Sequence, residues 1–293
     1  MEITLQREPN TEYILSLSYG KDSLACLEAI KLLGYPLDRI VHAEVWATDD
    51  IPADLPVMIE FKKYADDLIY EKYGIRVEHI YSIKDGEKQT YEKCFYSKIT
   101  TGKNKGRIYG FPFTIGSWCN DRLKLSVLEF VGAKGERVIR RDDGKRVKTV
   151  QYLGIAPDEP ERIKRQNNKR GVVLPLVDIG WDEEKCYEWC KENNLLSPIY
   201  YTAPRGGCWF CHYQGVDQLR ILRKEHPELW QLLLKWDDDS PTTFKSDGFT
   251  VHDFEKRFQY EDRGLLIPGD KKFRWKHLRK IEEKEKEIEN TES

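Results

Sequence analysis

The chain has 293 residues, of which 40% are hydrophobic, 33% charged and 12% aromatic, and its formal net charge is −2. This length and composition allow a full hydrophobic core, so we expect a globular protein with one large domain and a smaller appendage, which excludes a disordered chain. No run of eighteen apolar residues occurs, and the first twelve residues lack the basic and apolar zones of a secretion signal. We therefore expect a cytoplasmic protein without a membrane partner.

Charge is distributed unevenly along the chain. Residues 98–170 hold 18 Lys and Arg against 8 Asp and Glu, so this block carries +10 and the remainder −12. Such a basic block suits a polyanion, either the phosphates of a nucleotide or the backbone of tRNA or DNA. A solvated surface with a basic hairpin explains the same pattern equally well.

The first third of the sequence alternates between strand and helix patterns. Apolar strands are predicted at 13–18, 40–47 and 76–81, and helices at 22–33 and 56–73. Alternation of this kind is typical of a parallel sheet with right-handed crossovers. The fold class predicted is α/β, with a doubly wound, mostly parallel sheet.

The rest of the chain is less regular. A long irregular region is predicted at 84–117, two strands on either side of Asp143-Gly144, a loop at 158–165 and a strand at 172–176. Helices are predicted at 121–131, 182–194, 216–224, 227–235 and 251–260, followed by a charged terminal helix. We divide the chain into a nucleotide-binding α/β domain, 1–204, and a cysteine-motif and helical region, 205–293.

The stretch Ser18 to Ser23, SYGKDS, lies between the first predicted strand and the first predicted helix. Unpaired backbone N–H groups and the positive end of the helix dipole make such a loop an anion site. Gly20 permits close approach, Ser18 and Ser23 offer hydroxyls, and Lys21 supplies a positive charge. The spacing differs from the Walker P-loop and from G-x-G-x-x-G. The alternative is an ordinary turn capped by Asp22 or Ser18.

The same stretch resembles the SGGKDS signature of the PP-loop ATP pyrophosphatases, with Tyr19 in place of a glycine. Three later segments resemble the phosphoadenosine phosphosulfate (PAPS) reductase-like branch of that superfamily, in the same order: GSWCNDRLK (116–124), YLGIAPDEPERIKR (152–165), and LPLVDIGW with GGCWFC. Ala156 stands where that branch often has arginine. The resemblance implies an adenine nucleotide hydrolase-like fold that binds ATP or PAPS together with Mg²⁺.

The resemblance also implies roles for individual residues. The adenosine moiety would lie at Thr48 and Asp49, after the second strand. Lys124, with Arg162 or Arg165, would contact phosphate or sulfate, and Asp158 and Glu159 would order their loop. The residues implied in catalysis are Lys21, Asp22 and Lys124, and those implied in nucleotide binding are Ser18, Tyr19, Gly20, Lys21, Asp22, Ser23, Thr48, Asp49, Arg162 and Arg165.

Seven cysteines in a chain expected to be cytoplasmic indicate metal ligands, redox groups or buried apolar residues. Cys208-x-x-Cys211 forms a tight turn suited to chelation. The resemblance implies that Cys119, with 88 residues between it and Cys208, joins this turn as a ligand. These three cysteines would bind an iron–sulfur cluster or Zn²⁺. The fourth ligand would be His212, Cys94 or Cys190, or the fourth position would stay open. The predicted ligand set is Cys119, Cys208, Cys211 and His212. A redox-active CxxC is the alternative. Cys26, Cys186 and Cys190 are expected to pack in helices.

No cysteine follows Cys211, so the C-terminal catalytic cysteine motif of PAPS reductases is missing. The favoured hypothesis is an ATP-using enzyme that adenylates its substrate and then transfers sulfur from the cysteine centre, with tRNA or DNA as acceptor and a protein as sulfur donor. A second hypothesis is a sulfonucleotide reductase or sulfotransferase. A third is a nucleotide-regulated nucleic-acid-binding module with structural zinc.

Overall fold

The computed structural model describes residues 5–112, 117–128, 138–140, 146–166, 169–201 and 206–291. By its internal contacts the chain divides into two compact units, Met1–Cys211 and His212–Ser293. The division comes later than the boundary predicted after residue 204. The Cys208-x-x-Cys211 turn therefore belongs to the first unit and not to the helical one.

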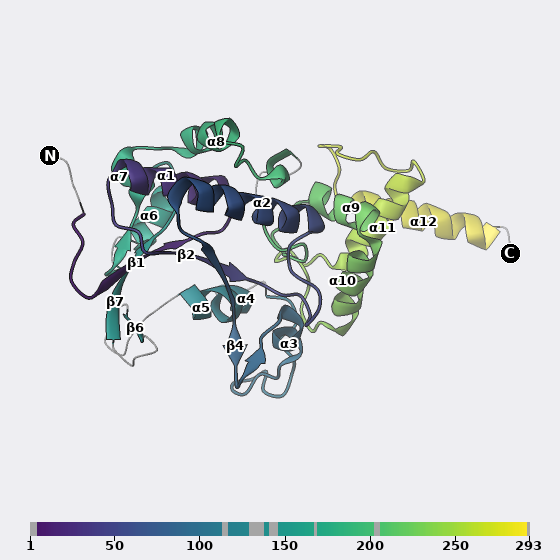
Figure 1. Cartoon of the computed structure of the whole chain (residues 1–293). Helices are drawn as coiled ribbons and strands as arrows, with labels where there is room; N and C mark the ends of the chain where they lie inside the picture. Colours follow the sequence, from purple (N-terminus) through teal and green to yellow (C-terminus); the bar gives the residue numbers. More distant parts are fainter. Residues whose placement is uncertain are drawn as a thin grey trace. The chain divides into compact units, whose positions relative to one another are not determined.

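A mixed sheet forms the centre of the first unit (Figure 1). Its order is β3 (Val77–Tyr81), β2 (Arg39–Glu44), β1 (Thr11–Ser16), β7 (Arg146–Tyr152) and β6 (Val138–Arg140), with β8 (Val172–Val173) also paired to β7. The pairings of β3, β2, β1, β7 and β8 are all parallel, and β6 runs antiparallel to β7. The predicted α/β class with a mostly parallel sheet is confirmed, and the architecture is compatible with a Rossmann-like fold.

Helices cover both faces of this sheet. Figure 1 shows α1 (Lys21–Leu32) and α2 (Pro56–Tyr73) on one face, and α4 (Trp118–Asn120) and α5 (Ser126–Leu128), joined by the π-helical turn η1 (Asp121–Leu125), on the other. Helix α1 packs against α7 (Pro175–Ile179) and α8 (Glu183–Glu192). Buried apolar side chains from β1, α1, α2 and α8 form one continuous core, which includes Cys26, Cys186 and Cys190 as expected.

Helix α2 begins and ends at the residues that the sequence predicts. Pro56 occupies its first position, where a missing N–H costs nothing, and Gly74 ends it in the left-handed conformation with φ of 70°. Its buried stripe comprises Met58, Phe61, Lys62, Ala65 and Ile69. A lysine in an otherwise apolar stripe is unusual, and it bears directly on the site below.

Three predictions for the irregular segments were wrong. The region 84–117 contains a small hairpin, β4 (Ile83–Lys84) with β5 (Glu87–Lys88), and the helix α3 (Tyr91–Tyr96), capped by the Thr90 hydroxyl. The predicted loop 158–165 is largely helix α6 (Pro160–Gln166). The predicted strand 172–176 stops at Val173 because Pro175 begins α7. Each missed helix begins at a capping residue or at a proline. In a short stretch of sequence, these signals carry too little weight against the pattern of apolar residues.

The second unit contains the helices α9 (Val216–Glu225), α10 (Pro227–Asp239), α11 (Val251–Asp262) and α12 (Lys276–Thr291). Trp230, Trp236 and Phe258 are almost fully buried in it. Around this core, Arg220 pairs with Glu261 at 2.6 Å and Arg223 pairs with Glu255 at 2.9 Å. The predicted helical character of the C-terminal region is confirmed. Among the residues that the structure describes, no helix is both long enough and apolar enough to cross a membrane.

Candidate functional site

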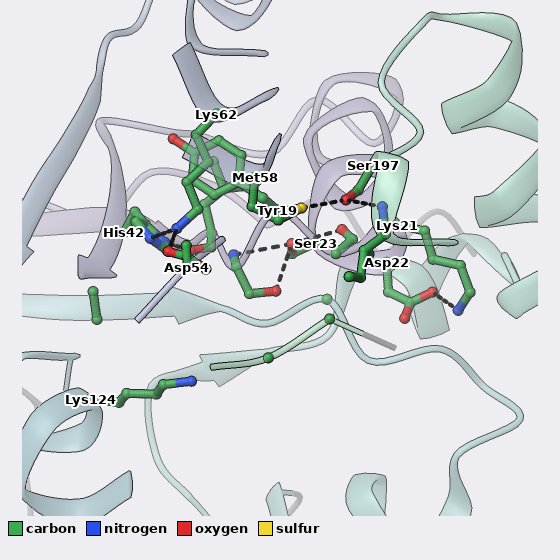
Figure 2. A pocket seen from close by; sticks show the side chains of 18 of the residues that line it. Tyr19, Lys21, Asp22, Ser23, His42, Asp54, Met58, Lys62, Lys124 and Ser197 are labelled. Carbon is green, nitrogen blue, oxygen red and sulfur yellow. Dashed lines mark hydrogen bonds and ion pairs between the residues drawn. The ribbon is translucent and has the colours of Figure 1, made fainter. Parts of the chain in front are cut away.

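A cavity of about 620 Å³ opens at the carboxyl ends of β1, β2 and β7, within the first unit (Figure 2). The chain runs outward from β1 through β2 to β3 and returns on the other side of β1 as β7, so this is the point where the strand order reverses. Open parallel sheets bind their ligands at such points. Every residue from Ser18 to Ser23 lines the cavity, as the sequence predicts for a ligand loop.

The loop is held together by its own hydroxyls. The Ser23 hydroxyl donates to the carbonyl of Gly20 at 2.9 Å and accepts from the amide of Ser18 at 3.1 Å. The amide of Lys21, in the first turn of α1, donates to the Tyr200 hydroxyl at 3.1 Å. A helix start leaves its first N–H groups without intrahelical acceptors, so this end of α1 offers donors and positive potential to an anion.

Gly154, just after β7, brings that strand against the first turn of α1. A Cβ atom at this position would lie 2.6 Å from the carbonyl oxygen of Asp22 and 2.6 Å from the Cα of Ser23. Real Cβ contacts do not approach so closely, and neither neighbour is a flexible side chain. Gly154 therefore allows the chain after β7 to pack closely against the loop Ser18 to Ser23, and it lines the cavity. The sequence analysis missed this role, although Gly154 lies in the segment YLGIAPDEPERIKR (152–165).

Tyr19 adopts the left-handed conformation, with φ of 57°. In the SGGKDS signature that this stretch resembles, the same position is a glycine. A non-glycine residue pays a conformational cost there. Its side chain is buried, and its hydroxyl donates to Asp66 and lies 3.1 Å from Nε2 of His79. Burial and the hydrogen bond to Asp66 raise the pKa of Tyr19, so it stays neutral. The buried ring and its partners compensate for the backbone cost.

The loop side of the cavity pairs each cation with carboxylates. Lys21 Nζ lies 2.8 Å from Asp22 and 2.9 Å from Glu183, and Arg162 pairs with Glu159. Burial acts to lower the pKa of Lys21, but hydrogen bonds to Asp22 and Glu183 outweigh it and raise the pKa. Burial raises the pKa of Asp22 and outweighs the hydrogen bond and charge of Lys21, which lower it, while Glu183 and Glu159 raise it to a smaller extent. The charged groups on this side of the cavity are therefore held in place by ion pairs.

A second group of charges comes from α2 and β2. Lys62 Nζ lies 2.5 Å from Asp54 and 2.8 Å from Nε2 of His42, as Figure 2 shows. Burial and then the charge of Lys62 hold the pKa of His42 well below its usual range, so its ring is neutral. The Nδ1–H of His42 then donates to the carbonyl of Leu17 at 2.8 Å, and Nε2 accepts from Lys62. Lys62 is a fixed cation on the cavity wall.

The predicted lysine and cysteines meet at another part of the cavity, which Lys124 and Cys208 both line. Burial and then the charges of Cys208 and Cys211 raise the pKa of Cys119 to about 12. The pKa of Lys124 is raised, first by the charge of Cys208. Cys119 and the Cys208-x-x-Cys211 turn come from distant segments of the chain and both lie near Lys124, and of these cysteines Cys208 lines the cavity.

These thiols do not complete a metal site by themselves. Across the described ranges of the chain, no group of three or more His, Cys, Asp or Glu side chains could hold a metal ion. His212 begins the second unit, where it is buried and its carbonyl accepts from Lys245 Nζ at 2.6 Å. Cys190 lies in α8 and its thiol donates to the carbonyl of Lys21 at 3.3 Å. The predicted cluster or zinc site stays a prediction.

Three residues predicted to bind the nucleotide lie outside the residues that line the cavity. Thr48 uses its hydroxyl to accept from the amide of Ile51 at 3.1 Å, and Asp49 is exposed and paired with Lys93 at 2.9 Å. Arg165 donates to the carbonyl of Glu161 in its own helix. Strand β2 ends at Glu44, earlier than predicted, and the chain then turns, so from the segment after β2 it is the carboxylate of Asp54, rather than that of Asp49, that reaches the cavity.

Sequence reasoning also missed His42, Lys62 and Tyr200. The position of Lys62 within the apolar stripe of α2 was a usable signal, because a lysine is rarely buried unless its ammonium group is paired with another polar group. His42 and Tyr200 gave no comparable signal. Parts of the basic block, residues 113–116, 129–137, 141–145 and 167–168, lie outside the described residues, so its surface is not described as a whole.

The chain was compared with known protein families and with curated proteins. No family matches it, and no curated protein matches it significantly.

Proposed function

We propose that the chain is a PP-loop enzyme that binds an adenine nucleotide and couples adenylation of an acceptor to sulfur transfer. The observation that carries this proposal is one cavity lined both by the anion-binding loop with Lys21 and by Cys208 with Lys124. A nucleotide held by the loop would therefore lie in the same space as a thiol. This also supports the adenine nucleotide hydrolase-like form of the Rossmann-like fold.

In the adenylation step, an acceptor oxygen attacks the α-phosphorus of ATP, the bond to the bridging oxygen breaks, and pyrophosphate leaves. Lys21 and the first N–H groups of α1 stabilise the charge that develops on the leaving group. Mg²⁺ neutralises the phosphates when bound, and because it needs only one or two protein carboxylates, Asp22 and Glu183 would hold it beside Lys21.

In the second step, a hydrosulfide-level sulfur supplied by an external sulfur donor displaces AMP from the adenylated atom. The sulfur forms the new bond and AMP takes the electron pair of the broken one. Lys124, beside Cys119, Cys208 and Cys211, would stabilise the negative charge of this hydrosulfide, and the thiols form no covalent bond to it. The described thiols do not form a ligand set for a metal, so no step is assigned to a cluster or to zinc.

The test is anaerobic incubation of the full chain with sulfide, a tRNA or DNA acceptor and labelled ATP and, in parallel, with PAPS in place of ATP. We expect AMP and pyrophosphate from ATP, and a loss of about 10²–10³-fold in Lys21→Ala, as when one preorganised charge-stabilising group is removed. Lys31→Ala is the matched control, since Lys31 lies at the far end of α1 and does not line the cavity.

Other outcomes would overturn the assignment. Tight PAPS binding without ATP turnover would favour a sulfonucleotide enzyme. Absence of turnover of either nucleotide, with stoichiometric zinc in the purified protein and no absorbance near 400 nm, would favour a nucleotide-regulated binding module instead.

A further inference from the structure

A second cavity of about 340 Å³ adjoins the nucleotide cavity in the first unit. It is formed by the end of β2, the start and middle of α2, and β3. The two cavities share the side chains of Val45, Asp54 and Lys62. The ion pair of Lys62 and Asp54 therefore forms part of a partition between them. A molecule in the second cavity would meet the same lysine that faces a nucleotide in the first.

The chemistry of this second cavity suits a flat ring that carries both N–H and carbonyl groups. Trp46 supplies an aromatic wall, and Pro52 and Ile59 supply apolar surface. An ammonium group has three N–H donors, and Lys62 uses one on His42 and one on Asp54, which leaves a third for a ring carbonyl. The Asp54 carboxylate has further lone pairs to accept a ring N–H.

Beside the second cavity, the surface presents aromatic and basic side chains. Lys88 Nζ lies 3.7 Å from the centre of the Trp46 ring and 5.9 Å from that of Tyr81, so the three side chains form one stack. Lys88 also donates to the backbone carbonyl of Asp49, which holds it in place. Tyr81 is 39% exposed, and the exposed Lys63 lines the cavity itself. Alternating rings and cations are what binding surfaces for single-stranded nucleic acids use.

We propose that the second cavity receives one unpaired base of a single-stranded nucleic acid, the acceptor of the reaction, while Lys63 and Lys88 contact its phosphates. The inference rests on the proposed function and names its substrate class. The ring carbonyl of the base accepts the third N–H of Lys62, whose side chain also lines the nucleotide cavity. Trp46 stacks on the base and sets its orientation.

The probes are short single-stranded RNA and DNA oligonucleotides of mixed sequence, with the corresponding duplexes as competitors. Binding to the full chain is measured by fluorescence anisotropy, and ATP binding is measured separately by calorimetry. We expect Trp46→Ala to weaken single-strand binding about tenfold or more, because stacking on one aromatic ring contributes on that order, and to leave ATP binding unchanged. Tyr187→Ala, an exposed ring on α8 outside both cavities, should change neither measurement.

A second variant, Lys63→Glu, keeps the proposal testable if Trp46→Ala fails to fold. It should weaken single strands and reduce the salt dependence of binding. The RNA and DNA arms decide which strand is the acceptor. Equal strand affinity in wild type and both variants, or equally tight binding of duplex, overturns the second-cavity site even if ATP is adenylated and cleaved. Strand binding that depends on Trp46 without any nucleotide turnover would instead overturn the proposed function and leave the binding site standing.

Discussion

Lys21 and Lys62 line the same cavity and are about equally buried, at 12% and 10% side-chain exposure, but they meet different partners. Lys21 faces two carboxylates, those of Asp22 and Glu183, so its group carries an excess negative charge. Lys62 faces one carboxylate and the neutral ring of His42, so its group is balanced.

The difference indicates two kinds of basic wall. On the loop side, the proposed function would have a polyphosphate replace the two carboxylates as the partner of Lys21, and the freed carboxylates would then bind Mg²⁺. On the α2 side, Lys62 is tied to β2 through His42 and to the turn before α2 through Asp54, so its position depends on the fold. Variants that separate stability from activity test this contrast.

The largest effect on stability is expected for Lys62→Met. The change keeps the length of the side chain but leaves Asp54 and Nε2 of His42 without their partner. Removing one member of a buried pair is strongly destabilising, and partial exposure of Asp54 reduces the penalty to about 2–3 kcal/mol of unfolding free energy. Urea denaturation measures it. Lys63→Met, exposed and next in sequence, should stay within about 0.5 kcal/mol. Equal stability of the two variants would contradict a fixed α2 wall.

Gly154→Ala should cost about 1–3 kcal/mol, the usual range for overpacking, because the added methyl group meets the backbone of Asp22 and Ser23. Nucleotide affinity should fall with it, since the loop must shift. The melting temperature and calorimetric binding of ATP report the two effects. Gly215→Ala serves for comparison, because its Cβ would lie 3.5 Å from Oε1 of Gln218 in ordinary contact and Gly215 does not line the cavity. If Gly154→Ala melts and binds like Gly215→Ala, the close packing of Gly154 against the loop does not support the cavity.

The smallest effect is a pH dependence from His79. Hydrogen bonds to Asp66 and then Glu44, at 2.8 and 2.9 Å, raise the pKa of His79 to about 9. Because the folded pKa lies above the unfolded value near 6.5, this stabilisation is complete below pH 6.5 and is lost as the pH rises through 9. The melting temperature should therefore decline between these values, and less steeply in His79→Gln. A variant with the wild-type pH profile would show that His79 does not hold Asp66 for Tyr19.

The sequence predicts those parts of the molecule that depend on local order. The strand, loop and helix from β1 to α1 follow from apolar periodicity and the residues of SYGKDS, and α2 follows from Pro56 and Gly74. Short helices such as α3 were missed because six residues give too little periodicity. In the site, the loop was found, but Asp54 was not, because the turn after β2 decides which carboxylate faces the cavity. Lys62 gains its role only from partners brought together by folding.

The pairing of β1 with β7 joins residues 11–15 to residues 148–152, and Gly154 follows directly. During synthesis, the loop Ser18 to Ser23 is thus complete long before the strand that supports it has left the ribosome. A nascent chain shorter than about 154 residues would contain the stretch SYGKDS without β7 and Gly154, which pack against it. If the loop binds a nucleotide as proposed, nucleotide affinity would report when β1 and β7 have paired in the growing chain.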